Sequence, residues 1–350
     1  PESLMPMPEA RAPGKLLLTG EYAVLGGAPA VAVAIGGPAI ATAQDADHWS
    51  VASSSADGRW AFDLESPDHV AFRTPPAGGV GDLPAALLTE ILRRWPAELM
   101  AQPQRLGLDT TAFAQRLAGQ PVKLGLGSSS ALVVALAGAL LKASGIQATP
   151  DDFRDVCVAA HRRFQDGRGS GVDVLTSIHG GLLIAAPGVA GLNPEPLPWP
   201  AGLHLVVAWT GKSASTPELI ARYETFQRTE PRVFESKNKA LADAARSAAQ
   251  AWRTGDATAV LNTVAGYGDA LRALDEAGGI GIWTDDHQRL AGLAAQAGGV
   301  YKTSGAGGGD LGYLLSPSPD VAMRFRAAVS DGGQRVLDVT PGQPGLQVRD

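Results

Sequence analysis

The stretch Lys123-Leu124-Gly125-Leu126-Gly127-Ser128-Ser129-Ser130, followed at once by the apolar run 131–141, decides how the first half of the chain folds. The two glycines allow backbone N–H groups to converge on one point, and the apolar run is typical of a buried helix. A helix that starts at such a turn carries roughly half a positive charge, and serine hydroxyls there donate to phosphate or hold Mg²⁺. The pattern predicts a phosphate-binding loop made by Gly125, Leu126, Gly127, Ser128, Ser129 and Ser130. A serine that only caps the helix is the alternative.

Two further glycine motifs lie at the two ends of the chain. In Ala12-Pro13-Gly14-Lys15, a lysine stands at the mouth of a buried strand, where it either contacts a phosphate or is an ordinary surface lysine. In Lys302-Thr303-Ser304-Gly305-Ala306-Gly307-Gly308-Gly309-Asp310, four glycines between 305 and 309 let a ligand or another loop approach closely. A flexible connector is the alternative for this third loop.

Asp173 follows a tight Gly169-Ser170-Gly171 turn and precedes an apolar stretch. This placement suits a carboxylate that is held in a cleft. An aspartate that caps the next helix explains the same residues, and the local sequence leaves both readings open.

Composition and charge exclude several classes of protein. The chain has 350 residues, which predicts two domains, and its 29 basic against 35 acidic residues give a net charge of −6 without a basic run. Non-specific nucleic-acid binding is therefore not expected. A single cysteine, Cys157, the absence of a signal-like N-terminus and an apolar run too short to span a bilayer predict a cytoplasmic protein with no membrane partner.

Periodicity predicts α+β layers in both halves of the chain. We expect strands over 15–19, 30–35, 203–209 and 335–340, and a hairpin over 49–72 that turns at Asp57-Gly58. We expect helices over 83–95, 131–144, 151–165 (capped near Asp151), 217–253, 256–276, 285–297 and 319–330. Five prolines between 186 and 200 predict a break in regular structure and the domain boundary.

At these motifs the chain resembles the GHMP kinase superfamily, whose three signature segments are present in the usual order. Within it, Gly20-Glu21-Tyr22-Ala23-Val24-Leu25, the segment from Ala160-His161 to Asp173, Trp209-Thr210-Gly211-Lys212 and Gly309-Asp310 resemble the phosphomevalonate kinases. The metal-binding glutamate of mevalonate kinases, eleven residues before the aspartate, would fall on Arg162. The resemblance implies a ribosomal protein S5-like N-terminal domain (1–198), a ferredoxin-like C-terminal domain (199–350) and an active site between them.

The resemblance also implies roles for individual residues. ATP and Mg²⁺ are the expected cofactors, with Ser129 as a metal ligand and the loop from Gly125 to Ser130 around the phosphates. Lys15, Lys123 and Asp173 are the expected catalytic residues, with Asp173 orienting Lys15 or acting as a base. Arg162, Arg163 and Arg168 are possible helpers. The expected acceptor-binding residues are Glu21, Tyr22, Ser170, Gly171, Lys212, Ser213, Ser215, Thr216, Ser304, Gly305, Ala306 and Gly307.

The expected reaction is transfer of a phosphoryl group from ATP to phosphomevalonate, in the mevalonate route to isoprenoids. A phosphate acceptor has a second pKa near about 6 and needs little help from a base, whereas the alcohol of mevalonate would need more. Mevalonate kinase, another superfamily kinase, and a binding protein without turnover are the alternatives. The sequence leaves a monomer and a homodimer equally open.

Overall fold

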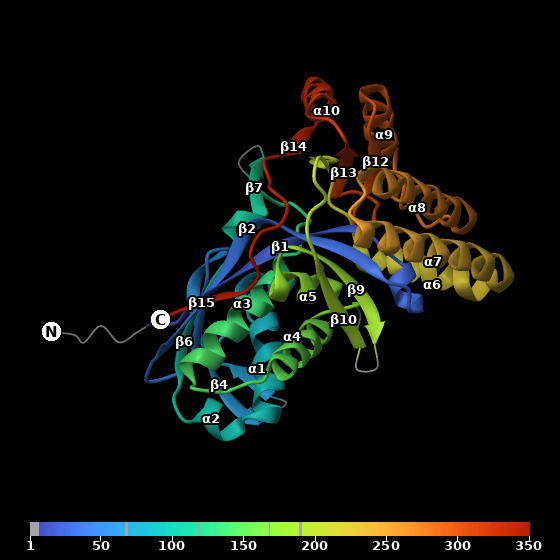
Figure 1. The fold of residues 1–350 in the computed structure, drawn as a ribbon. Coiled ribbons are helices and arrows are strands. Elements are labelled where there is room, and N and C mark those ends of the chain that lie inside the picture. Colours follow the sequence, from blue (N-terminus) through green and yellow to red (C-terminus); the bar gives the residue numbers. More distant parts are fainter. Residues whose placement is uncertain (1–6, 67–68, 118–119, 168, 189–190) are drawn as a thin grey trace.

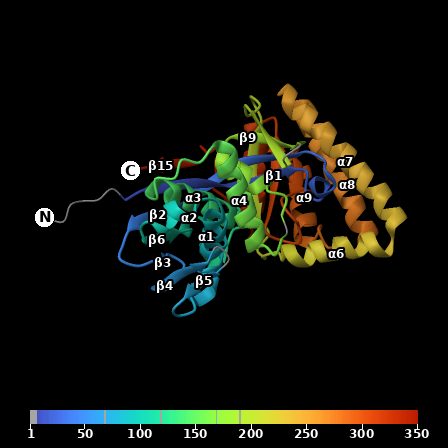
Figure 2. The same ribbon diagram turned by 90° about the horizontal axis from the view of Figure 1, so that it is seen from below.

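The protein is described here by a computed structural model that covers residues 7–66, 69–117, 120–167, 169–188 and 191–350. Its chain folds into two regions, each with a β-sheet and helices packed on it. In Figure 1 most of the blue-to-green first half of the chain and the orange-to-red helices α7 to α10 (residues 231–331) occupy opposite sides of the molecule, whereas the red end of the chain lies beside the blue strands, and Figure 2 shows the same arrangement from below. The predicted α+β class is confirmed.

The first region contains a sheet of nine strands within the described residues. Its order is β10-β9-β2-β6-β3-β4-β5, and β1 pairs with both β2 and β15. The strands are β1 (Glu9–Thr19), β2 (Ala30–Asp45), β3 (Ser50–Ser53), β4 (Ala56–Ser66), β5 (His69–Phe72), β6 (Gln104–Asp109), β9 (Leu182–Gly188), β10 (Gly191–Leu197) and β15 (Gln347–Arg349). A separate hairpin of β7 (Ala114–Leu117) and β8 (Gln120–Lys123) leads into the predicted phosphate loop.

One central helix explains the core of this region. The helices are α1 (Asp82–Arg94), α2 (Pro96–Met100), α3 (Ser128–Ala143), α4 (Pro150–Phe164) and α5 (Val172–His179), with the short 3-10 helix η1 (Ala23–Gly26). Helix α3 packs on β1 and β2 and is buried on nearly every side, as its apolar sequence predicts. It begins at Ser128, three residues before the predicted start, so the serines form its first turn.

The second region has a four-stranded sheet in the order β12-β13-β11-β14. Its strands are β11 (His204–Trp209), β12 (Val300–Thr303), β13 (Leu311–Ser316) and β14 (Arg335–Leu337). Its helices are α6 (Thr216–Thr229), α7 (Pro231–Thr254), α8 (Ala257–Gly278), α9 (Asp285–Ala297) and α10 (Pro319–Asp331). The stretch predicted as one helix over 217–253 is two helices, because Pro231 cannot donate the backbone hydrogen bond that would continue α6.

Two expectations about β-structure are wrong. The proline-rich stretch forms the hairpin β9–β10, because β10 is an edge strand and an edge strand needs no ladder hydrogen bond on its outer side. The turn between β3 and β4 lies before Ala56, so Asp57-Gly58 belongs to strand β4. Strand pairing decides which residues form the turn of a hairpin. A two-residue turn signal such as Asp57-Gly58 carries no information about that pairing.

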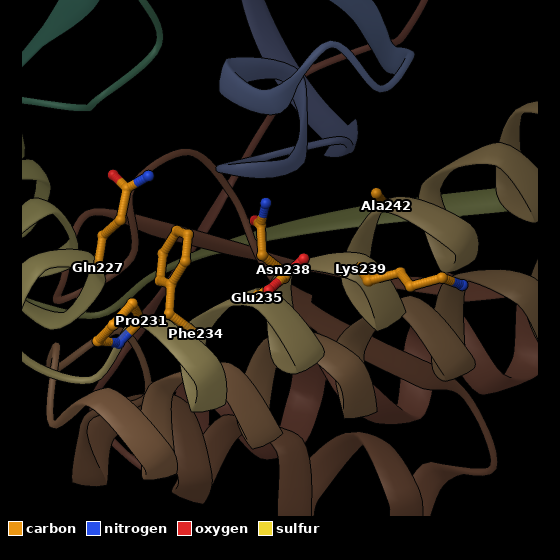
Figure 3. A pocket seen from close by; sticks show the side chains of 7 residues that line it. All are labelled: Gln227, Pro231, Phe234, Glu235, Asn238, Lys239 and Ala242. Atoms are coloured by element: carbon orange, nitrogen blue, oxygen red, sulfur yellow. The ribbon is translucent and has the colours of Figure 1, made fainter.

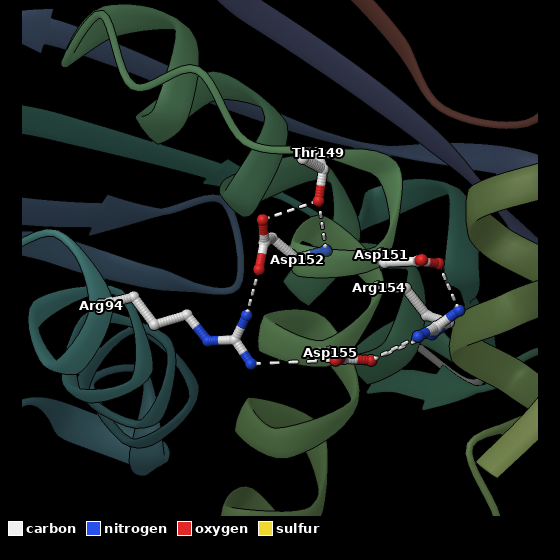
Figure 4. A network of polar contacts seen from close by, with 6 residues as sticks. All are labelled: Arg94, Thr149, Asp151, Asp152, Arg154 and Asp155. Carbon is white, nitrogen blue, oxygen red and sulfur yellow. Dashed lines mark hydrogen bonds and ion pairs between the residues drawn. The ribbon is translucent and has the colours of Figure 1, made fainter. Parts of the chain in front are cut away.

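The cap of α4 differs from the predicted one. The Thr149 hydroxyl accepts the Asp152 N–H at 3.1 Å and donates to the Asp152 carboxylate at 2.6 Å, so Thr149 and not Asp151 is the N-cap. Figure 4 shows how Asp152 then binds Arg94 of α1 at 2.8 Å, while Arg154 binds Asp151 at 2.7 Å. The Arg94 contact holds the start of α4 against α1, whereas the pair of Arg154 and Asp151 lies within α4.

The end of the chain returns to the first sheet. Strand β15 pairs antiparallel with β1, and the Gly342 N–H donates to the Ala34 carbonyl at 2.9 Å. The chain changes from one sheet to the other between β10 and β11, and its last residues return to the first sheet. The domain division at residue 198 stays a prediction. None of the helices in the described residues is both long and apolar enough to cross a lipid bilayer.

Candidate active site

The predicted phosphate loop has the geometry of an anion cradle. Gly125 and Gly127 have φ of 72° and 77°, the left-handed region that favours glycine. Gly127 is the N-cap of α3, and no side chain caps the helix there. The Ser130 hydroxyl is buried and donates to the Gly127 carbonyl at 2.8 Å, whereas Ser128 and Ser129 are half-buried. The simple serine-cap alternative is therefore wrong, and the first-turn amides of α3 keep their capacity to bind an anion.

Lys15 lies directly over this loop. Its N–H donates to the Leu126 carbonyl at 2.9 Å, which joins β1 to the loop. A Cβ added to Gly127 would lie 3.1 Å from Cγ and 3.2 Å from Cε of Lys15, so the lysine side chain crosses the glycine. Lys123 follows from the end of β8 and is exposed. Two cations thus flank the loop, which is the charge arrangement that a polyphosphate requires.

Asp173 lies in the first turn of α5 and is 23% exposed. The N-cap of that helix is Gly171, and the Ser170 hydroxyl accepts the Val172 N–H at 3.3 Å, so Asp173 is not needed as a cap. An ion pair between Lys15 and Asp173 is not found within the part of the chain that the structure describes. The orienting role of Asp173 toward Lys15 stays a prediction.

The structure brings a third residue between Ser129 and Asp173. His161 is buried, and its Nε2 lies 3.0 Å from the Ser129 hydroxyl, while its Nδ1 lies 3.7 Å from an Asp173 carboxylate oxygen. With the proton on Nδ1, Nε2 accepts the Ser129 O–H, and the lone pairs of Ser129 are left for another partner. In the sequence, His161 stands out only as a mark of the family resemblance. This contact is not predictable from the sequence, because Ser129, His161 and Asp173 come from three different helices.

Hard oxygen donors at this place fit Mg²⁺. Mg²⁺ is usually held by one or two protein oxygens together with substrate phosphates and water. Ser129 and Asp173 supply a hydroxyl and a carboxylate beside the phosphate loop. No cluster of three or more histidine, cysteine, aspartate or glutamate side chains that could hold a metal was found among the residues that the structure describes. The residues present therefore suit a metal that arrives with a nucleotide.

Glu21 and Tyr22 are buried rather than open to a cleft. The Lys302 ammonium donates to Glu21 Oε1 at 2.6 Å, and the Tyr22 hydroxyl donates to the Ala306 carbonyl at 2.6 Å. Burial raises the pKa of Glu21 and lowers the pKa of Lys302, and the attraction between the two charges opposes both shifts. Both contacts join the first region to the third glycine loop. Direct substrate binding by Glu21 and Tyr22 stays a prediction.

The third glycine loop packs mainly against other parts of the protein. The Ser304 hydroxyl donates to the Leu17 carbonyl at 2.9 Å and accepts the Leu17 N–H at 3.1 Å. A Cβ on Gly307 would lie 2.5 Å from Ile282, whereas a Cβ on Gly305 would meet nothing within 4 Å. The sequence predicted either close approach of a ligand or another loop, or a flexible connector. At Gly307 another loop does approach closely, whereas Gly305 has free space beside it.

The predicted acceptor segment lies beside this loop. Lys212 is 75% exposed and pairs with Asp286 at 2.8 Å. Ser213, Ser215 and Thr216 are exposed, and α6 begins at Thr216. The predicted helper Arg162 donates to the backbone carbonyls of Gly169 and Ser170. Arg163 contacts Glu90 at 2.9 Å, and Arg168 lies outside the described residues.

Two surface hollows lie near these elements. One, of about 290 Å³, is lined by predicted residues Ser170 and Gly171 together with Arg162 and Arg154. The other, of about 440 Å³, lies on α6 and α7, where Asn238 points toward η1 (Figure 3). None of the glycine motifs lines the second hollow, so we place the candidate active site at the motifs.

The chain is similar to known kinases over nearly its whole length. The family "GHMP kinases N terminal domain" matches residues 105–181, which include the phosphate loop and Asp173. A phosphomevalonate kinase of Streptomyces sp. (strain CL190) is 30% identical, over 96% of this chain and 97% of that protein. A mevalonate kinase of Pyrococcus horikoshii is 29% identical, over 97% of each chain.

The fold agrees with this similarity. The Streptococcus pneumoniae phosphomevalonate kinase, solved in complex with phosphomevalonate and AMPPNP, superposes with a TM-score of 0.75. The match covers 96% of this chain and all of that chain at 19% identity, so it shows a common fold. The three glycine motifs, the two-region α+β fold and the whole-length similarity lead to one conclusion. The chain belongs to the GHMP kinase family.

Proposed function

We propose that this kinase transfers the γ-phosphoryl group of ATP to the phosphate of phosphomevalonate and forms diphosphomevalonate. The observation that carries the proposal is the arrangement around Ser129. Mevalonate kinases resemble this chain but have a metal-binding glutamate where Arg162 stands. Arg162 is exposed and faces the backbone of residues 169 and 170, and the imidazole of His161 contacts Ser129 instead. Asp173 is then the carboxylate that reaches this place from α5.

A phosphate acceptor suits a site in which Asp173 holds the metal and no carboxylate has to act as a general base. The acceptor is mostly dianionic at pH 7, so its terminal oxygen attacks the γ-phosphorus without first losing a proton. The bond between the γ-phosphorus and the bridging oxygen breaks, and ADP leaves with that electron pair. The main obstacle is repulsion between two anions, which cations must reduce while they hold the groups in line.

Different residues of this chain bind the ATP phosphates, the metal and the acceptor. The Gly125–Ser130 loop binds the ATP phosphates through the amides of α3, and Ser129 with Asp173 would hold Mg²⁺. Mg²⁺, when bound, neutralises charge on the transferring group. Lys15 and Lys123 stabilise the same charge from the sides of the loop. Lys212, Ser213, Ser215 and Thr216 bind the acceptor from the exposed start of α6.

The test is ADP release with phosphomevalonate and with mevalonate as separate acceptors at equal ATP. We expect turnover with phosphomevalonate and, in its presence, a loss in Lys15→Met. Turnover with mevalonate alone would identify a mevalonate kinase. ATP binding without transfer to either acceptor would support a binding protein and would refute the proposal.

A further inference from the structure

Asp310 lies where three separate segments of the chain meet. Its N–H donates to the Lys212 carbonyl at 2.7 Å, and its carbonyl accepts the Thr210 N–H at 2.9 Å. The Ala214 N–H donates to its carboxylate at 3.3 Å. The predicted acceptor segment is therefore hydrogen-bonded to both the backbone and the carboxylate of Asp310. In the sequence, Asp310 stands out only as a mark of the family resemblance, with no role of its own.

The side chain of Asp310 lies against the phosphate loop. A Cβ added to Gly125 would be 2.8 Å from Cβ, 3.0 Å from Cγ and 3.3 Å from Oδ2 of Asp310. Lys15 crosses Gly127, two residues further along the same turn. The side chains of Lys15 and Asp310 thus lie over one short turn, within electrostatic range of each other, although no ion pair within 4.0 Å joins them in the described part of the chain. Burial raises the pKa of the Asp310 carboxyl, and the attraction of Lys15 opposes that rise.

Two features make a carboxylate costly at this place. Asp310 has φ of 51°, a left-handed conformation that is strained for a residue with a side chain and unstrained for glycine, and it directly follows three glycines. A negative charge beside a phosphate loop also repels the phosphates, unless a cation balances it. A glycine here would remove both costs. Strain and like charge together therefore point to a role for the carboxylate.

We infer that Asp310 is a positioning residue, whose carboxylate holds the Lys15 ammonium over the Gly125–Gly127 turn and the Ala214 amide beside it. Through this electrostatic attraction and the Ala214 hydrogen bond it keeps the donor side and the acceptor side of the site in register. The inference rests on the proposed phosphoryl transfer. Asp310, in the second region of the molecule, thus takes the role of orienting Lys15. The sequence attributes that role to Asp173.

The test compares Asp310→Asn with Asp310→Gly. Asparagine tolerates the left-handed backbone and can still accept the Ala214 N–H, but it lacks the charge; glycine relieves the strain and lacks the side chain. A misplaced lysine can cost about 100-fold in rate. We expect kcat to fall by about that factor in both variants. The Kd for AMPPNP, measured by calorimetry, should stay equal or fall, since a charge that repels phosphates has been removed.

A double variant tests the connection to Lys15. If Asp310 acts through Lys15, Lys15→Met with Asp310→Asn loses no more activity than Lys15→Met alone. The matched control is Asp243→Asn, an exposed aspartate on α7 that pairs with Lys239 and Arg246, and it should leave kcat unchanged. Losses that multiply, a kcat within twofold of wild type in Asp310→Asn, or a Kd that rises in parallel with the loss of kcat would overturn the inference.

The same experiments distinguish a failure of the Asp310 inference from a failure of the proposal that phosphomevalonate is the acceptor. If the wild-type protein phosphorylates mevalonate and not phosphomevalonate, the acceptor proposal is wrong. The kcat, Kd and double-variant comparison is then made with mevalonate, and it decides the role of Asp310 by the same criteria. Urea unfolding of each variant checks the fold, and Asp310→Gly supplies an unstrained backbone if Asp310→Asn unfolds.

Discussion

Replacing Lys302 by methionine removes one half of a fully buried ion pair between the two regions of the molecule. The Lys302 and Glu21 side chains are 0% and 2% exposed, and 2.6 Å separates the ammonium from Glu21 Oε1. Lys302 also donates to the Thr303 carbonyl at 2.5 Å and lies 5.4 Å from the Tyr267 ring centre. The other oxygen of Glu21 is buried and has no hydrogen-bond partner in the described part of the chain. The ammonium is therefore the main compensation for the buried carboxylate.

The expected loss of stability is large. Removing one partner of a buried pair typically costs about 3–5 kcal/mol, which is a large share of the about 5–15 kcal/mol of a folded protein. Replacing both partners by apolar residues of similar size is often neutral, because neither charge is left in the interior. We therefore expect Lys302→Met to be strongly destabilised and Glu21→Leu with Lys302→Met to recover most of the loss.

The pH dependence has a definite sign. In Lys302→Met the buried Glu21 has lost the ammonium that most opposes the effect of burial, so the pKa of its carboxyl rises further above the unfolded value. A group with a raised folded pKa contributes stability at low pH and loses it as pH rises. The deficit of Lys302→Met should thus be smaller at pH 5 than at pH 8.

The assay is urea unfolding followed by circular dichroism, with the slope m compared between variants. Lys239→Met is the matched control, because Lys239 is 76% exposed in its pair with Asp243 and should change stability by less than about 1 kcal/mol. The reasoning is refuted if Lys302→Met costs less than about 1 kcal/mol, or if the double variant is no more stable than Lys302→Met.

Three further predictions follow from the site and its surroundings. Ser129→Ala should raise KM for Mg·ATP and leave the fold intact, as measured by initial rates and circular dichroism; unchanged constants, with Ser128→Ala equally silent, would remove the phosphate-loop reading. Lys15→Met should lower kcat at least as much as Asp173→Asn, because one well-placed charge is worth about 3–4 kcal/mol and a dianionic acceptor needs little base; an inactive Asp173→Asn that still binds Mg·ATP, beside a mild Lys15→Met and a rate that falls with a single acidic limb near neutral pH, would make Asp173 a true base. Burial lowers the pKa of His287 from 6.5 to about 4, so about 3 kcal/mol of stability present above pH 6.5 should be lost as pH falls toward 4; His287→Gln should flatten that part of the urea-midpoint profile, and an equally steep profile would contradict it.

The sequence by itself predicted the features that depend on neighbouring residues. The glycine and serine pattern before α3 locates the phosphate loop, because left-handed turns and the start of a helix are local properties. The apolar run of α3 predicts burial, since periodicity and composition are local as well. The α+β class followed from periodicity and the family resemblance from the short motifs, and both are confirmed.

Only the tertiary structure decided which side chains meet. Lys302 and Glu21 are 281 residues apart in the chain, and no periodicity or turn signal connects them. Asp310 lies against Gly125 because the strand order places the start of β13 beside the end of β11, and the folded regions bring these strand ends against the phosphate loop. His161 is likewise one residue of the amphipathic helix α4, and only the packing of that helix places its side chain beside Ser129. Such contacts depend on the relative placement of whole elements, a quantity set by the total packing free energy and not by any local stretch of sequence.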